Sequence, residues 1–153
     1  MSRGLWTPVI AVLLAATTLF ALQPHRPAHA VSPSIVISQV YGGGGNVGAP
    51  YQNDFIELFN RGTTTVSLAG WSVQYASATG TGNFGATSAQ IAELPSISLA
   101  PGQYLFVHAA SGGSSGVPLP TADVTDATPI NMSATGGKVA LVNSMVSLGC
   151  NGG

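Results

Sequence analysis

The residues that could carry out acid, base or nucleophilic chemistry are few after residue 30. The acids there are Asp54, Glu57, Glu93, Asp123 and Asp126, and the one histidine is His108. Asp54 and Glu57 are three positions apart, and a strand sends side chains at that spacing to opposite faces, so the two cannot work as a paired acid and base. No Gly-x-Ser-x-Gly elbow surrounds a serine, and His108, at the end of an apolar segment, has no oriented partner in the sequence. We therefore predict no catalytic residue and a satisfied His108 ring.

The sequence also offers few candidate ligands for a metal ion or a cofactor. One histidine and one cysteine are too few ligands for zinc. Asp123 and Asp126 could contribute oxygens to a calcium site in a loop, but two carboxylates are a nonspecific pattern and we favour a solvated loop. Gly43-x-Gly45-x-x-Gly48 matches the dinucleotide-binding pattern, which must open a helix. Here it leads into another strand, so we predict no cofactor and a mobile inter-strand loop.

The charge balance excludes one class of partner. Arg61 and Lys138 are the only cations after residue 30. Binding of DNA or RNA needs a basic surface that neutralises phosphates. We therefore expect this domain alone to bind no nucleic acid.

Residues 1–30 have the order of a secretory signal peptide. Arg3 precedes an apolar run over residues 5–22, and Ala28-His29-Ala30 is a small-x-small cleavage pattern. About eighteen apolar residues could also just span a bilayer, which is the alternative interpretation. We favour a signal peptide over 1–30, a mature chain that begins at Val31, a secreted product and no membrane contact after cleavage.

Cys150 is the only cysteine in the sequence. An unpaired cysteine in an exported protein indicates a partner in another chain or in further sequence, or a natural free thiol. Because the chain stops at a glycine-rich turn just after its last expected strand, we favour a domain over 31–153 that is truncated at its C-terminal end.

The mature sequence alternates with period two and has no helical periodicity, which predicts an all-β domain. Expected strands cover 35–41, 55–59, 104–107 and 138–142, weaker ones 64–68, 89–94 and 130–132, and 110–120 is an expected loop. Trp71, Val73 and Tyr75 alternate with Ser72, Gln74 and Ala76, and we expect their side chains to point inward, with Trp71 between two sheets. Asn60, Gly62 and Gly70 suit turns with positive φ, and Pro101-Gly102 is a turn signal. Short strands without crossover helices indicate an antiparallel sandwich or barrel.

Three sequence blocks carry a family resemblance. They are Asp54-Phe55-Ile56-Glu57-Leu58-Phe59-Asn60, then Leu68-Ala69-Gly70-Trp71, and then Leu99-Ala100-Pro101-Gly102. In order and spacing they resemble the lamin tail domain, over most of residues 34–143. The resemblance implies an immunoglobulin-like antiparallel β-sandwich, found in nuclear lamins and in exported bacterial proteins, where it often accompanies nuclease or phosphatase domains. The opening at residues 37–46 is similar to the bacterial exported type, and the expected last strand has no counterpart here.

These observations lead to one function hypothesis and two alternatives. The first is a non-catalytic extracellular interaction or scaffolding module with an unknown protein or surface partner. The second is an N-terminal accessory domain of an exported nuclease or phosphatase whose catalytic domain is not in this chain. The third is a surface adhesion or carbohydrate-binding module, which would need exposed aromatic side chains on one face.

Overall fold

The computed structural model describes residues 34–151, which fall within one compact unit, Val31–Gly153. Nine strands and one short 3₁₀ helix follow each other along the described residues. They are β1 (Ile35–Tyr41), β2 (Phe55–Asn60), β3 (Val66–Ser67), β4 (Ser72–Ser77), η1 (Ser88–Gln90), β5 (Ile91–Glu93), β6 (Ser98–Leu99), β7 (Tyr104–His108), β8 (Val124–Thr125) and β9 (Gly137–Val142). The all-β prediction is confirmed. The expected signal peptide lies outside the described residues.

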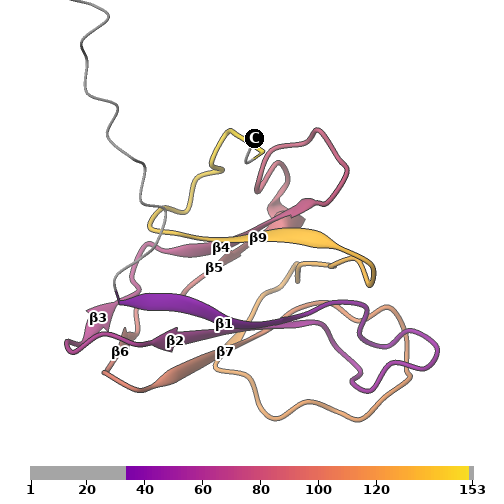
Figure 1. The fold of residues 1–153 in the computed structure, drawn as a ribbon, viewed down its shortest axis with the longest axis horizontal. Coiled ribbons are helices and arrows are strands. Elements are labelled where there is room, and N and C mark those ends of the chain that lie inside the picture. Colours follow the sequence, from indigo (N-terminus) through magenta and orange to yellow (C-terminus); the bar gives the residue numbers. More distant parts are fainter. Residues whose placement is uncertain (1–33, 152–153) are drawn as a thin grey trace, which may run out of the picture. The chain divides into compact units, whose positions relative to one another are not determined.

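Two sheets form the layers of the sandwich, and a two-stranded ribbon closes one end (Figure 1). One sheet has the order β1-β2-β7-β8, the other the order β5-β4-β9, and β3 pairs with β6. All strand pairs are antiparallel except β7 and β8, which run parallel. The antiparallel prediction therefore fails at β8. The long connection over 109–123 lets the chain return beside β7 in the same direction, as a parallel neighbour requires.

The core lies between the layers and is mostly aliphatic, with Tyr75 as an aromatic member. From the first sheet it receives Ile56, Leu58, Leu105 and Val107, and from the second Val73 and Tyr75. These residues alternate with outward ones because successive strand side chains point to opposite faces. The segment over 130–132 forms no strand, contrary to expectation. It nevertheless contributes Ile130 and Met132 to the core, because an apolar side chain can be buried from an irregular segment.

The inward face of β4 differs in part from prediction. Val73 and Tyr75 are buried as expected, but Trp71 precedes the strand and is only partly buried at the margin of the core. Its backbone is engaged instead, since the Trp71 N–H donates to the Leu68 carbonyl and its carbonyl accepts from Leu94. The prediction that Trp71 fills the space between the sheets is therefore wrong.

The opposite face of β4 is covered as well. Ser72 and Gln74 are fully buried, although their alternation with apolar residues indicated an exposed face. The segment over residues 144–151, which we call the C-terminal strap, covers them. The Ser72 hydroxyl donates to the Ser144 carbonyl at 2.6 Å, Gln74 Nε2 donates to the Val146 carbonyl at 2.9 Å, and Gln74 Oε1 accepts from the Leu148 N–H at 3.0 Å.

The turns follow the sequence signals at Gly70 and at Pro101-Gly102. Gly70 and Gly102 have φ of 78° and 77°, and the Gln103 N–H donates to the Ala100 carbonyl across the Pro101-Gly102 turn. Asn60 and Gly62 do not take positive φ, contrary to expectation. Asn60 acts through its side chain, whose Nδ2 donates to the carbonyls of Thr64 and Leu99 and whose Oδ1 accepts from the Gly62 N–H. The amide thus joins the β2 end to the ribbon.

Candidate functional site

Asp54 is the one acid that the fold buries among the described residues. It lies just before β2 with 1% of its surface exposed. Its Oδ1 accepts a hydrogen bond from the Gly44 N–H at 2.6 Å and its Oδ2 accepts one from the Met132 N–H at 2.7 Å. Burial raises the pKa of Asp54 above the ordinary 3.8, while these backbone donors oppose that rise. The carboxyl group therefore cross-links the glycine loop to the 130–132 segment and does not face solvent.

The glycine loop over residues 42–48 packs against the long connection after β7. The loop connects β1 to β2, as the expected inter-strand loop would, and its residues Gly43, Gly44 and Gly45 are buried. The Gly44 carbonyl accepts from the Gly112 N–H at 2.7 Å, and a Cβ on Gly44 would collide with the backbone of Asn53. Close backbone approach explains the glycines. The next element after the loop is β2 rather than a helix, so the arrangement lacks the helix N-terminus that binds phosphate.

The remaining candidate residues are scattered over the domain. Asp123 lies before β8 and its Oδ2 accepts from the Phe106 N–H at 2.7 Å, while Asp126 lies after β8 and its Oδ1 accepts from the Thr128 N–H at 3.1 Å. His108 ends β7, and its Nε2 is buried without a hydrogen-bond partner in the described part of the chain. The expectation of a satisfied His108 ring is therefore wrong. Cys150 is exposed in the C-terminal strap.

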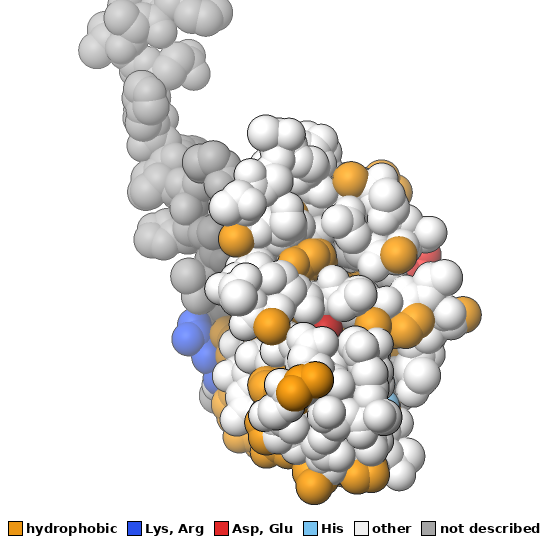
Figure 2. Space-filling view, turned by 90° about the vertical axis from the view of Figure 1, so that its right-hand side faces the viewer, with side chains coloured by type: hydrophobic (Ala, Val, Ile, Leu, Met, Phe, Trp, Pro, Cys, Tyr) orange, Lys and Arg blue, Asp and Glu red, His pale blue; other side chains and the backbone are white. Residues whose placement is uncertain are grey.

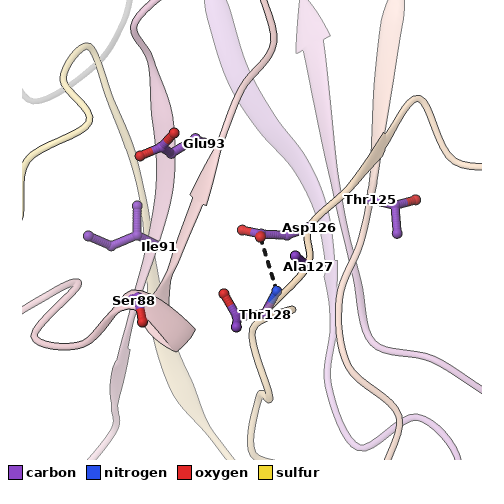
Figure 3. A pocket seen from close by; sticks show the side chains of 7 residues that line it. All are labelled: Ser88, Ile91, Glu93, Thr125, Asp126, Ala127 and Thr128. Atoms are coloured by element: carbon purple, nitrogen blue, oxygen red, sulfur yellow. Dashed lines mark hydrogen bonds between the residues drawn. The ribbon is translucent and has the colours of Figure 1, made fainter.

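A shallow cleft of about 300 Å³ separates β5 from the segment after β8 (Figure 3). It is lined by Ser88, Ile91, Glu93, Thr125, Asp126, Ala127 and Thr128. Glu93 and Asp126 come from opposite walls, and Asp126 is occupied by its bond to Thr128. Over residues 34–151, no group of three or more His, Cys, Asp or Glu side chains is placed to hold a metal ion. No helix among the described residues is long and apolar enough to cross a membrane.

The outer side of the β1-β2-β7 sheet is unusual because aromatic residues gather there. Nine aromatic residues follow residue 30, and six of them lie on this side. We call it the aromatic face and define it by Tyr41, Tyr51, Phe55, Phe59, Tyr104 and Phe106, together with His108. Figure 2 shows hydrophobic side chains in the lower part of the molecule, which is the part that holds β1, β2 and β7 in Figure 1.

Strand register arranges the aromatic face in three rows. Antiparallel partners share a face, so the rows run across the strands. They are Val36–Phe59–Tyr104, then Gln39–Glu57–Phe106, and then Tyr41–Phe55–His108. A bulge at Ser38 keeps the later β1 residues in phase with β2. If Ser38 were paired in regular alternation instead of bulged out, Gln39 and Tyr41 would fall on the same side as Ile35 and Ile37 and point toward the core.

Aromatic rings pack against each other at both ends of the face. At one end Tyr41 stacks on Phe55 with centroids 5.5 Å apart, and Tyr51 meets both rings edge-on. At the other end the ring centroids of Phe59 and Tyr104 lie 4.6 Å apart. Tyr104 remains 56% exposed and Tyr51 39% exposed. Their side chains are therefore held by neighbours and still reach solvent.

Glu57 occupies the centre of the aromatic face. Its Oε1 accepts a hydrogen bond from the Ser38 hydroxyl at 2.6 Å, and its Oε2 accepts none from any described residue. The side chain is partly exposed. The face therefore presents one oriented hydrogen-bond acceptor between two aromatic ends.

The sequence contained part of this signal. Phe55, Glu57 and Phe59 alternate with Ile56 and Leu58, which assigns the aromatic residues to the side away from the core. What it did not contain was the pairing of three strands that brings Tyr41 and Tyr104 onto the same side. We identified no aromatic face from the sequence for that reason.

The comparison with known families agrees with the fold. The profile of the Lamin Tail Domain family matches residues 28–149, most of the chain. No curated protein matches the chain. Members of that family are immunoglobulin-like domains without catalytic function. The chain belongs to the Lamin Tail Domain family.

Proposed function

We propose that the chain is a non-catalytic interaction module that works outside the cell and makes contact through the aromatic face. The order of residues 1–30, with a positive start, an apolar run and an Ala-His-Ala end, supports export. Membership of a family of interaction modules supports a binding role.

The aromatic face, on which Tyr104 and Tyr51 are exposed, is the observation that carries this proposal. A monomer gains stability by burying aromatic rings, yet Tyr75 is the one aromatic member of the core cluster of the described residues, and Tyr104 and Tyr51 remain in contact with water. Rigid aromatic side chains lose little conformational entropy on binding, which is why they are enriched at contact surfaces. The face is thus built for contact rather than for stability.

The acids support a non-catalytic role. The Asp54 carboxylate accepts hydrogen bonds from two backbone N–H groups, and Asp123 and Asp126 each accept a hydrogen bond from one backbone N–H group. Catalysis requires a group that can reach a substrate with a suitable proton affinity. These carboxylates stabilise loops instead.

The proposal is tested by surface binding of the secreted protein. The chain, exported from its full-length gene and labelled with a fluorophore, is mixed with cell-surface material of the source organism and sedimented. We expect co-sedimentation that falls at least tenfold in Tyr104→Ala and is unchanged in Val146→Ala, because Val146 is 73% exposed in the C-terminal strap, away from the aromatic face. Absence of binding, or equal binding by both variants, would refute the proposed role.

A further inference from the structure

We propose that the aromatic face binds an extended, uncharged polysaccharide made of equatorially linked pyranose rings, of the cellulose or chitin type. This inference rests on the proposed function and names its ligand class. The two ring groups would stack on the apolar faces of sugar rings, and Glu57 would accept a hydrogen bond from a sugar hydroxyl.

The spacing of the rows fits a ligand longer than one sugar. Tyr104 and His108 are four residues apart on β7, which corresponds to about 14 Å at roughly 3.4 Å per strand residue. Each end of the face carries aromatic rings, and the middle row carries the polar side chains Gln39 and Glu57 beside the ring of Phe106. A chain of linked sugars repeats the same apolar face and the same hydroxyl edge, so it can satisfy both ends and the centre at once.

The open shape of the face points to a flat ligand. The rings lie on the outer surface of a sheet, whereas the cleft beside β5 and a second one beside β8 lie elsewhere. A pyranose whose substituents are equatorial presents a flat C–H surface on each side. Chains of such rings form a ribbon that can lie along a sheet without a pocket.

The charge of the face selects an uncharged ligand. Lys138 donates from its Nζ to Asn151, and Arg61 follows β2 in a turn, so neither cation belongs to the three rows. Glu57 would repel a uronate, sulfate or phosphate group placed over the middle row. A wholly apolar partner would bury the second carboxylate oxygen of Glu57, Oε2, without a hydrogen bond, because the Ser38 hydroxyl satisfies only Oε1, and burying an unpaired charged oxygen is costly.

The same carboxylate disfavours a second copy of this chain as the occupant. Two-fold association of identical faces is self-complementary, so the same surface patch is used on both copies. Glu57 lies in the middle row, and its counterpart would lie close to it across the contact. Two carboxylates brought together away from water repel each other. A hydroxyl-rich ligand has no such conflict.

The experiment measures binding of cellohexaose and chitohexaose to the secreted protein by calorimetry, with hexagalacturonate as the anionic counterpart. We expect saturable binding of at least one neutral hexasaccharide and none of the anionic one. Tyr104→Ala and Tyr51→Ala should each weaken binding about tenfold or more, which corresponds to roughly 1.4 kcal/mol. Tyr104→Phe should retain most of the affinity because it keeps the ring.

Two controls test whether a loss of affinity arises at the aromatic face. Val146→Ala should bind like the wild type, and circular dichroism of each variant shows whether the fold is intact. Tyr104 is exposed enough for its truncation to leave the core in place. Glu57→Gln should weaken neutral-sugar binding without creating strong binding of hexagalacturonate.

Three results would overturn the inference. These are no binding of either neutral hexasaccharide, binding that Tyr104→Ala and Tyr51→Ala leave unchanged, or a dimer in sedimentation that Tyr104→Ala dissociates. If cell-surface binding still depended on Tyr104 while both sugars failed, the interaction role would stand and only the ligand class would be wrong. If neither depended on Tyr104, both proposals would fail.

Discussion

Replacing Asp54 with alanine tests whether this acid is a structural cross-link. The substitution removes the acceptors of two buried hydrogen bonds, from the N–H groups of Gly44 and Met132. Each buried donor left without a partner costs about 1–3 kcal/mol, which sums to roughly 2–6 kcal/mol. Removing a carboxyl group from a buried position relieves its desolvation and offsets part of this. We therefore expect the free energy of unfolding to fall by about 2–4 kcal/mol.

That loss is large for a domain of this size. Small domains unfold with about 5–15 kcal/mol, and urea lowers this by roughly 1–3 kcal/mol per molar. With a slope of about 2 kcal/mol per molar, the urea midpoint of Asp54→Ala should fall by about 1–2 M. The matched control is Asp126→Ala, which loses one exposed hydrogen bond to the Thr128 N–H and should change stability by about 0.5 kcal/mol or less.

The measurement is a set of urea melts of residues 31–153 at neutral pH, followed by circular dichroism. Equal midpoints for the Asp54→Ala and Asp126→Ala variants would refute the cross-link. Asp54 would then be free for another role, and its position beside the glycine loop would have to serve function instead of stability.

Four further predictions concern other parts of the chain. Burial raises the folded pKa of Asp54 above 3.8, so the native state binds more protons at this group than the unfolded state does. The contribution of Asp54 to stability is therefore greatest below pH 3.8 and is lost as pH rises through the folded pKa. In melts between pH 3 and 7, the stability of the wild type minus that of Asp54→Asn should fall with rising pH, and a flat or rising difference would contradict this. Gln74→Leu leaves the Val146 carbonyl and the Leu148 N–H unpaired. It should lower the free energy of unfolding by about 2–4 kcal/mol and speed up hydrogen exchange over 144–151. Unchanged exchange there would show that Gln74 does not hold the C-terminal strap. Trp71→Ala should cost less than the roughly 3–5 kcal/mol typical of a fully buried tryptophan, because Trp71 is only partly buried; a loss within that range in urea melts would contradict the marginal position. N-terminal sequencing of the secreted protein should give Val31 as its first residue. Activity assays should show no turnover of DNA or phosphoesters with divalent metal, and turnover abolished by Glu57→Gln would contradict the non-catalytic role.

Local pattern was sufficient for the longer strands, but it predicted a strand over 130–132 that does not form, and it missed β6 and β8. Alternation along 55–59 separates the residues of β2 into two faces, and Pro101-Gly102 predicted the turn before β7, because both depend on neighbours in sequence. The family resemblance rested on the same local blocks. These features can be predicted without knowing which residues pack against them.

Burial of polar groups could not be read in this way. The sequence indicates that Gln74 lies on the side of β4 away from the core, and it does, yet the C-terminal strap covers that side and buries it. Asp54 similarly appeared as one acid among several. Only the approach of the glycine loop and the 130–132 segment turns it into a buried acceptor.

The sequence by itself determined the fold class, the alternation of each strand and the scarcity of charge, since these depend on residue types and their order. Tertiary structure alone decided the aromatic face. Tyr41, Phe55 and Tyr104 belong to three strands that are far apart along the chain, and only the register of β1 with β2 and of β2 with β7 places their rings on one side of the sheet around Glu57. A period-two pattern fixes which way a side chain points within its strand, but strand pairing fixes which side chains become neighbours.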